Sequence, residues 1–165
     1  MLLLEEKVAV ITGGTSGIGA RTAEVFAAND AKVVIAGRRK DRGERLAQKL
    51  GEAASFIRAD VSVEADVKNM IDHAVHRFGR LDCLMNNAGS GSQFAAIADA
   101  DLEQFDAVIA VHLRAVLAGM KYASRVMAVW PYKARAASST SRVSTECEQA
   151  WEGTTTRLQR QPRFT

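Results

Sequence analysis

The sequence predicts an α/β fold in which a parallel sheet carries helices on both faces. Short apolar runs rich in β-branched residues alternate with longer stretches whose apolar residues recur at helical spacing. The short runs are apolar throughout rather than alternating, which is typical of strands that are buried on both faces. Because no second set of such runs follows residue 127, we expect an incomplete sheet of about four strands and four helices.

The expected elements alternate strictly between strand and helix along residues 1–127. The first strand runs into a glycine-rich turn, and the fourth is followed by the longest apolar pattern of helical period in the chain. We expect strands at Val8–Thr12, Ala31–Ala36, Ser55–Arg58 and Leu81–Met85, and helices at about Ile18–Ala28, Arg42–Leu50, Glu64–Phe78 and Asp101–Met127.

The segment 128–165 has a different character from the segment 1–127. It is rich in Ser, Thr, Arg and Gln, and its few large apolar residues follow no period. Such a composition buries too little apolar surface to offset the entropy of ordering the chain. We therefore expect a folded half-domain over 1–127 and an aberrant, disordered tail over 128–165.

Composition argues against several classes of protein. With 165 residues, 47% hydrophobic and 25% charged, the chain has the size and composition of one globular domain. The start is too short for a signal peptide, and no later run is long enough to span a membrane. Cys83 and Cys147 form no metal-binding or CxxC spacing, so we expect a reduced, cytoplasmic setting and no metal. The net charge of +3 has no basic helical stripe behind it, so we expect no nucleic-acid partner.

A glycine-rich turn joins the first strand to the first helix. Glycines permit a tight turn and a close backbone approach to a pyrophosphate, while the helix N-terminus supplies free N–H groups. A purely structural turn uses the same residues, but strand, turn, helix and second strand stand here at the spacing of a dinucleotide site. The chain reads Thr12-Gly13-Gly14-Thr15-Ser16-Gly17-Ile18-Gly19, and we expect cofactor contacts from Gly13, Thr15, Ser16, Gly17, Ile18 and Gly19.

The residues after the second strand indicate which dinucleotide is bound. An acidic residue there would hold the ribose 2′-hydroxyl of NAD, but the chain reads Ala36-Gly37-Arg38-Arg39. Two guanidinium groups suit bidentate contact with a 2′-phosphate. We therefore expect NADP as the cofactor. NAD is the alternative, with Arg38 and Arg39 as solvated charges that open a basic helix.

Two further motifs follow strands of the expected sheet, namely Asp60-Val61 after the third and Asn86-Asn87-Ala88-Gly89 after the fourth. Together with the T-G-x-x-x-G-x-G form of the first turn, they make residues 6–127 resemble the classical short-chain dehydrogenase/reductase (SDR) family. The resemblance implies a doubly wound, Rossmann-like sheet. It also implies that Asp60 and Val61 meet the adenine end of the cofactor, and that Asn87, Ala88 and Gly89 border its ribose and nicotinamide. Taken singly, Asp60 could be a helix cap and the asparagine pair a turn.

The residues that catalyse the reaction in this family are not found in the chain. SDR enzymes transfer hydride between the nicotinamide and a carbonyl or alcohol, using an Asn-Ser-Tyr-Lys set in which the lysine lowers the pKa of the tyrosine. Here His112 occupies the family Asn position, either as a tolerated variant or as a polar residue on a packed helix. Tyr122 is followed four places later by Val126, and Tyr132 by Ala136. We therefore identify no catalytic residue and expect this chain to be inactive.

The tail carries the missing motifs when its codons are read in a shifted frame. Pairing the third base of each codon with the first two of the next allows codons 135–143 to spell G-S-I-I-N-I-S-S, with wobble bases chosen freely. Codons 155–160 can then spell Y-S-A-S-K. Our interpretation is that the reading frame slipped near codons 128–134. The alternative is a genuine divergent tail.

Three functions remain open from the sequence alone. The first is an NADP-dependent oxidoreductase by descent, and the second an inactive fragment that retains nucleotide binding. The third is a non-catalytic interaction module with a functional tail. Without the second half of the sheet, we expect the first strand to lack one neighbour and apolar helix faces to be uncovered. The resemblance implies a subunit interface along the 101–127 helix, whose apolar residues fit either a homo-oligomer or core packing.

Overall fold

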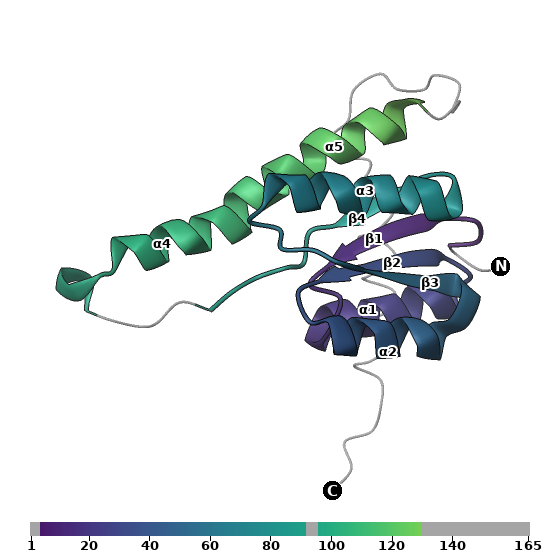
Figure 1. Ribbon diagram of the computed structural model, residues 1–165, viewed down its shortest axis with the longest axis horizontal. Helices are drawn as coiled ribbons and strands as arrows, with labels where there is room; N and C mark the ends of the chain where they lie inside the picture. Colours follow the sequence, from purple (N-terminus) through teal and green to yellow (C-terminus); the bar gives the residue numbers. More distant parts are fainter. Residues whose placement is uncertain (1–3, 92–95, 130–165) are drawn as a thin grey trace, which may run out of the picture. The chain divides into compact units, whose positions relative to one another are not determined.

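The computed structural model describes residues 4–91 and 96–129. Within them the chain forms a four-stranded parallel sheet with helices on both faces, as the sequence predicts (Figure 1). Residues 130–165, which make up most of the expected tail, lie outside the described residues. The expectations of disorder and of a separate C-terminal segment therefore stay predictions.

The sheet contains the four strands expected from the sequence, with ends that differ by no more than two residues. Its order is β3-β2-β1-β4, and every pair is parallel. In this register Val10 lies between Val34 of β2 and Leu84 of β4. The strands are β1 (Val8–Thr12), β2 (Lys32–Gly37), β3 (Ala54–Arg58) and β4 (Cys83–Met85).

The first strand has neighbours on both sides, contrary to the expectation from the sequence. Strand β4 pairs with β1 on the side opposite β2, so β1 is an inner strand. The expectation was wrong because it assigned this place to the second half of the sheet, whereas the chain crosses back to fill it with β4. Within the described residues, the outer strands are β3 and β4.

Helices cover both faces of the sheet, with α1 and α2 on one side and α3 and α5 on the other (Figure 1). The apolar period of each stretch predicted its helix, and the helix from Glu64 to Phe78 agrees at both ends. No helix among the described residues is long and apolar enough to cross a membrane. These four helices are α1 (Gly17–Ala28), α2 (Lys40–Leu50), α3 (Glu64–Phe78) and α5 (Ala115–Val129), and short 3₁₀ turns occupy Gly51–Ala53 and Ile97–Asp99.

The single helix expected over Asp101–Met127 is interrupted. Helix α4 (Leu102–Ile109) leads into a π-helical segment, η3 (Ala110–Arg114), before α5 begins. Asp101 starts α4, where its carboxylate accepts hydrogen bonds from two backbone N–H groups of the first turn. A wider π turn leaves little trace in apolar periodicity, so the sequence pattern predicted only a continuous helix. Such turns often occur at functional sites.

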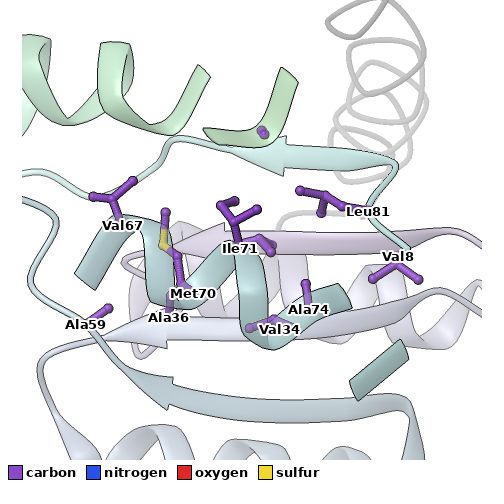
Figure 2. Packing of buried hydrophobic residues seen from close by; sticks show 11 residues of the cluster. Val8, Val34, Ala36, Ala59, Val67, Met70, Ile71, Ala74 and Leu81 are labelled. Carbon is purple, nitrogen blue, oxygen red and sulfur yellow. The ribbon is translucent and has the colours of Figure 1, made fainter. Parts of the chain in front are cut away.

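The main core lies between α3 and the sheet (Figure 2). Residues four and three apart on α3 form one apolar face, and each of them is at least 99% buried. This face packs on apolar side chains of β1 and β2. The α3 residues are Val67, Met70, Ile71 and Ala74, and their partners on the strands include Val8, Val10, Val34 and Ala36.

Helix α5 is fixed to α3 by polar as well as apolar contacts. Glu64, at the start of α3, accepts hydrogen bonds from Lys121 Nζ at 2.7 Å and from the Tyr122 hydroxyl at 2.8 Å. The hydrogen bond from Lys121, followed by that from Tyr122, lowers the pKa of the Glu64 carboxyl below its usual value. Beside these contacts the side chain of Ala123 is buried against the core. The contacts set the position of the α4–η3–α5 segment beside the sheet.

Candidate functional site

The carboxyl ends of all four strands border one hollow, a cavity of about 200 Å³. Parallel α/β sheets bind ligands outside this edge, where the direction of strand order reverses. In this sheet the reversal lies between β1 and β4. The hollow, called the groove below, is lined by Gly13, Thr15, Gly37, Arg38, Arg39, Ala59, Asp60, Val61, Ala88, Gly89, Ser90 and Val111.

Two glycines of the first turn are required by the packing around the groove. Gly13 has a φ of +65°, and a Cβ placed on it would lie 2.9 Å from the Ala88 Cα. A Cβ on Gly19 would lie 2.5 Å from the Asn87 side-chain nitrogen. The turn therefore packs directly against the residues that follow β4. Both glycines leave room for this contact.

The hydroxyl of Thr12 joins the ends of β1 and β4. It accepts hydrogen bonds from the backbone N–H groups of Asn87 at 2.9 Å and Ala88 at 3.0 Å, and it donates to the Met85 carbonyl at 3.2 Å. The Asn87 side chain in turn donates to the Thr12 carbonyl at 2.9 Å. Thr12 is 98% buried, so these groups have little access to water. The predicted cofactor residue Asn87 therefore holds the wall of the groove in place from behind.

The start of α1 and the end of β2 are connected through Arg39. Its Nε donates to the Thr15 hydroxyl at 3.2 Å, and its Nη2 donates to the Ser16 hydroxyl. Ser16 occupies the N-cap position of α1, yet its side chain makes no capping hydrogen bond to the helix. The N-terminal amides of α1, the positive end of the helix dipole and the Arg39 guanidinium thus lie close together. This arrangement favours an anion.

Asp60 is held in its charged form beside Arg38. Its Oδ1 accepts hydrogen bonds from the Ser62 hydroxyl at 2.7 Å and the Ser62 backbone N–H at 3.0 Å, and Oδ2 lies 3.9 Å from an Arg38 nitrogen. The hydrogen bonds from Ser62, followed by the charge of Arg38, lower the pKa of the Asp60 carboxyl. The position before α3 is Val63, so Asp60 does not cap that helix, which was one of the two interpretations from the sequence.

The depressed pKa of Asp60 has a defined effect on stability. Because the folded-state pKa lies below the ordinary value of 3.8, the carboxylate favours the folded state at pH values above 3.8. That contribution is lost as the pH falls through the folded-state pKa. Near neutral pH the groove therefore contains one carboxylate and two guanidinium groups.

The structure brings most of the predicted site residues together. Five of the thirteen do not line the groove. Asn87 and Gly19 pack behind it, Ser16 contacts Arg39, Gly17 has a φ of +55° in the turn, and Ile18 is 61% exposed. The eight that line it are Gly13, Thr15, Arg38, Arg39, Asp60, Val61, Ala88 and Gly89.

Four lining residues were not predicted to bind cofactor. Gly37 is the last residue of β2 and Ala59 directly follows β3, so their position at the strand ends was a usable signal. Ser90 and Val111 reach the groove only through the path of the chain after β4 and through η3. No local sequence pattern marks either of these two.

His112 contacts the residues after β4. The side chain is exposed, and its Nε2 lies 3.1 Å from the Ser90 backbone nitrogen and 3.0 Å from the Ser90 carbonyl oxygen. It therefore does more than face solvent from a packed helix. Tyr122 does not line the groove, since its hydroxyl donates to Glu64. In residues 4–91 and 96–129, no group of three or more His, Cys, Asp and Glu side chains could hold a metal ion.

Comparison with known proteins identifies the family. The sequence model of the short chain dehydrogenase family matches residues 7–153. The match therefore continues past Met127, the last residue of the segment in which the sequence analysis found family motifs. The chain therefore belongs to the short-chain dehydrogenase/reductase family.

Individual relatives cover the same part of the chain. It is 48% identical to tropinone reductase-like 1 from Erythroxylum coca over 127 residues. The aligned segment covers 75% of this chain and 47% of that protein. It is 48% identical over 124 residues to momilactone A synthase from Oryza sativa subsp. japonica, covering 74% of this chain and 45% of that protein. The chain spans about half the length of these curated relatives.

A solved structure shares the fold. The crystal structure of 3-ketoacyl-(acyl-carrier-protein) reductase from Brucella melitensis complexed with NADH matches with a TM-score of 0.72 and 41% sequence identity. The match covers 74% of this chain and 51% of that one. At this identity the Rossmann-like sheet expected from the sequence is confirmed.

The Thr12 hydroxyl makes a testable contribution to stability. Thr12→Val keeps the shape of the side chain but removes the hydroxyl that accepts from the Ala88 N–H, whereas the Asn87 N–H and the Met85 carbonyl keep their own hydrogen bond at 3.0 Å. We expect a loss of roughly 1–3 kcal/mol in the free energy of unfolding, which is the cost of about one unsatisfied buried group. Urea denaturation measures the loss. Thr22→Val is the matched control, because this buried hydroxyl donates only to the Ile18 carbonyl within α1. Equal losses in the two variants would contradict the role given to Thr12.

Proposed function

We propose that this chain binds NADP in the groove and that, in its present form, it does not catalyse hydride transfer. The observation that carries the first part is the convergence of a glycine turn, a helix N-terminus and two arginines at the carboxyl ends of β1 and β2. Oxidoreductase activity on carbonyl or alcohol groups is the function we assign to the gene by descent. The second part follows from the missing catalytic residues.

The residues that line the groove support binding of a dinucleotide. Asp60 and Val61 would meet the adenine, while Gly13, Thr15 and the first turn of α1 would bind the pyrophosphate. The close approach of the glycine turn to Ala88 leaves backbone rather than side chains facing the ligand. When bound, the nicotinamide supplies the hydride-transfer chemistry, and the wall from Ala88 to Ser90 would border its ribose.

The charges at the end of β2 favour NADP over NAD. Gly37 closes the strand where an acidic residue would contact the 2′-hydroxyl of NAD. Arg39 is already oriented by Thr15 and Ser16, and Arg38 is 71% exposed and paired with Asp60 only at 3.9 Å. A long, exposed ion pair contributes little, so Arg38 can turn to a phosphate at small cost. NAD stays the alternative cofactor.

The preference for NADP depends on the two arginines. We expect Arg38→Ala and Arg39→Ala each to weaken NADP binding roughly tenfold or more, which is the scale of a hydrogen bond to a charged group. NAD binding should change far less, because NAD lacks the 2′-phosphate. Calorimetric titration with both dinucleotides measures the difference. Arg45→Ala is the control, since Arg45 is exposed on α2 and does not line the groove.

Two outcomes would count against this cofactor assignment. Equal losses for NADP and NAD would mean that the arginines act on the shared part of the dinucleotide. Binding of neither dinucleotide to the unaltered chain would remove the proposal of cofactor binding altogether.

The proposed inactivity rests on the residues that follow Met127. No tyrosine in the chain has a lysine four places later, and the shifted frame supplies both the serine motif and Y-S-A-S-K. We propose that a frame slip near codons 128–134 replaced the catalytic part of the sequence. The family match to residue 153 keeps a genuine divergent tail as the alternative. In that case the chain is a non-catalytic nucleotide-binding or interaction module.

The coding DNA tests this proposal directly. We expect the alternative frame, sequenced from codon 120 onward, to stay open through the serine and tyrosine motifs and well beyond codon 165. The present chain should show no NADPH oxidation above background with a panel of ketones, whereas the chain made from the repaired gene should turn over. A stop soon after codon 143 in the alternative frame, or turnover by the present chain, would refute the frame slip or the inactivity respectively.

A stripe of apolar side chains along α4, η3 and α5 supports a homo-oligomer. Successive members lie three or four residues apart and so fall on one helical face. Leu102 is 72% exposed, and Leu113 and Leu117 are each 64% exposed. A continuous exposed apolar face of this kind is typical of an interaction surface. We propose that a second copy of the chain covers it. The stripe consists of Leu102, Phe105, Ile109, Leu113, Leu117 and Met120.

Charged substitutions on the stripe test the oligomer. We expect light scattering to give twice the chain mass for the unaltered protein and the single chain mass for Leu113→Glu combined with Leu117→Glu, because a dimer would bury these charges. Ile97→Glu is the control, since Ile97 is 93% exposed and lies outside the stripe. A single-chain mass for the unaltered protein at all concentrations would contradict the proposal.

A further inference from the structure

The wall of the groove after β4 is in contact with the π-helical segment η3. The His112 ring lies against Gly89, where an added Cβ would come within 3.0 Å of the ring carbon Cε1. Its Nε2 is 3.1 Å from the Ser90 nitrogen and 3.0 Å from the Ser90 carbonyl oxygen. Both Gly89 and Ser90 line the groove. The histidine therefore contacts two residues of the wall without itself lining the groove.

One ring nitrogen cannot make both contacts at once. When Nε2 carries a lone pair it accepts a hydrogen bond from the Ser90 N–H, and when it carries a proton it donates to the Ser90 carbonyl. In either form the imidazole is bonded to the backbone of the same residue. The contact therefore restrains the path of the chain at Ser90 in both tautomers.

Two consecutive residues of the π-helical segment η3 lie at this wall. Val111 lines the groove itself, and its neighbour His112 contacts Gly89 and Ser90. A π turn holds an additional residue relative to an α turn, which changes the direction of side chains locally. Two consecutive residues of the segment thereby support the same part of the groove.

We propose that His112 is a positioning residue that holds the wall from Ala88 to Ser90 in its binding geometry through the backbone of Ser90. Because His112 is exposed, its effect is directional rather than a matter of apolar burial. The expected effect of His112 on cofactor affinity rests on the proposed function. The expected effect of His112 on the order of the wall is independent of that function, since the contact is present without a ligand.

Three variants separate this role from general stabilisation. His112→Leu keeps bulk at the site and removes the hydrogen bond. His112→Gln places an amide at about the reach of Nε2, and it can both donate and accept. His76→Leu is the matched control, because His76 is exposed on α3 and does not line the groove. Circular dichroism of each variant verifies that the fold is kept.

Two measurements on these variants test the two parts of the proposal. In the ligand-free protein, NMR-detected hydrogen exchange at the Ser90 amide should accelerate roughly fivefold in His112→Leu, which is the scale of one net hydrogen bond. The dissociation constant of NADPH, measured by nicotinamide fluorescence, should rise by a similar factor. His112→Gln should restore both quantities, and His76→Leu should leave both unchanged.

The outcomes distinguish this proposal from the function on which it rests. Unchanged Ser90 exchange in His112→Leu, or failure of His112→Gln to restore it, would overturn the positioning role. Faster exchange with an unchanged NADPH dissociation constant would also overturn it, because the wall would then move without effect on binding. If the unaltered chain bound no NADPH while Ser90 exchange responded as expected, the cofactor proposal would fail and the restraint on the wall would stand.

Discussion

The geometry of the groove depends on the buried hydroxyl of Thr12. Strand β4 has only three residues, so its ladder with β1 is short and ends at Met85. Beyond that point the Thr12 hydroxyl and the Asn87 amide take over the pairing of the two chain segments. Asn87 also limits the space beside Gly19 at the start of α1. A strand end, the wall after β4 and the first helix are thus fixed relative to one another by one small hydrogen-bonded unit.

The charges in the groove are arranged for an anion, although Asp60 adds a negative charge of its own. Ser62 stabilises the Asp60 carboxylate, which lowers its pKa and keeps it ionised. Arg38 lies near this carboxylate, so that a phosphate and Asp60 would share one guanidinium group. Arg39 is bonded only to hydroxyls among its described contacts and keeps its full charge for a ligand. The two arginines therefore differ in their present partners, a carboxylate for Arg38 and hydroxyls for Arg39.

The features that could be predicted from the sequence are those that depend on local residue patterns. Apolar runs located all four strands, and the glycine turn with Asp60 and the Asn86-Asn87 pair located the groove at their carboxyl ends. The inner position of β1 follows from the strand order of a doubly wound sheet, which the resemblance implied, so the expectation of a missing neighbour was an error of topology and not of local pattern. The contacts of His112 with Ser90 and the place of Val111 depend on a π turn, which a period of 3.6 residues does not reveal. The missed features are those set by tertiary contacts.

The order of the strands explains how half of a family fold can carry a binding groove. Because β1 lies between β2 and β4, the turn after β1 is supported on both sides by strands present in the chain. The part of the groove to which we assign the pyrophosphate and adenosine is therefore formed by residues that the structure describes. Beyond β4 the wall includes Ala88, Gly89 and Ser90, of which Ala88 is hydrogen-bonded to Thr12 and Ser90 to His112. In the proposed function, cofactor binding depends on the residues of the groove, whereas the proposed loss of catalysis concerns the segment after Met127, so the second does not remove the structural basis of the first.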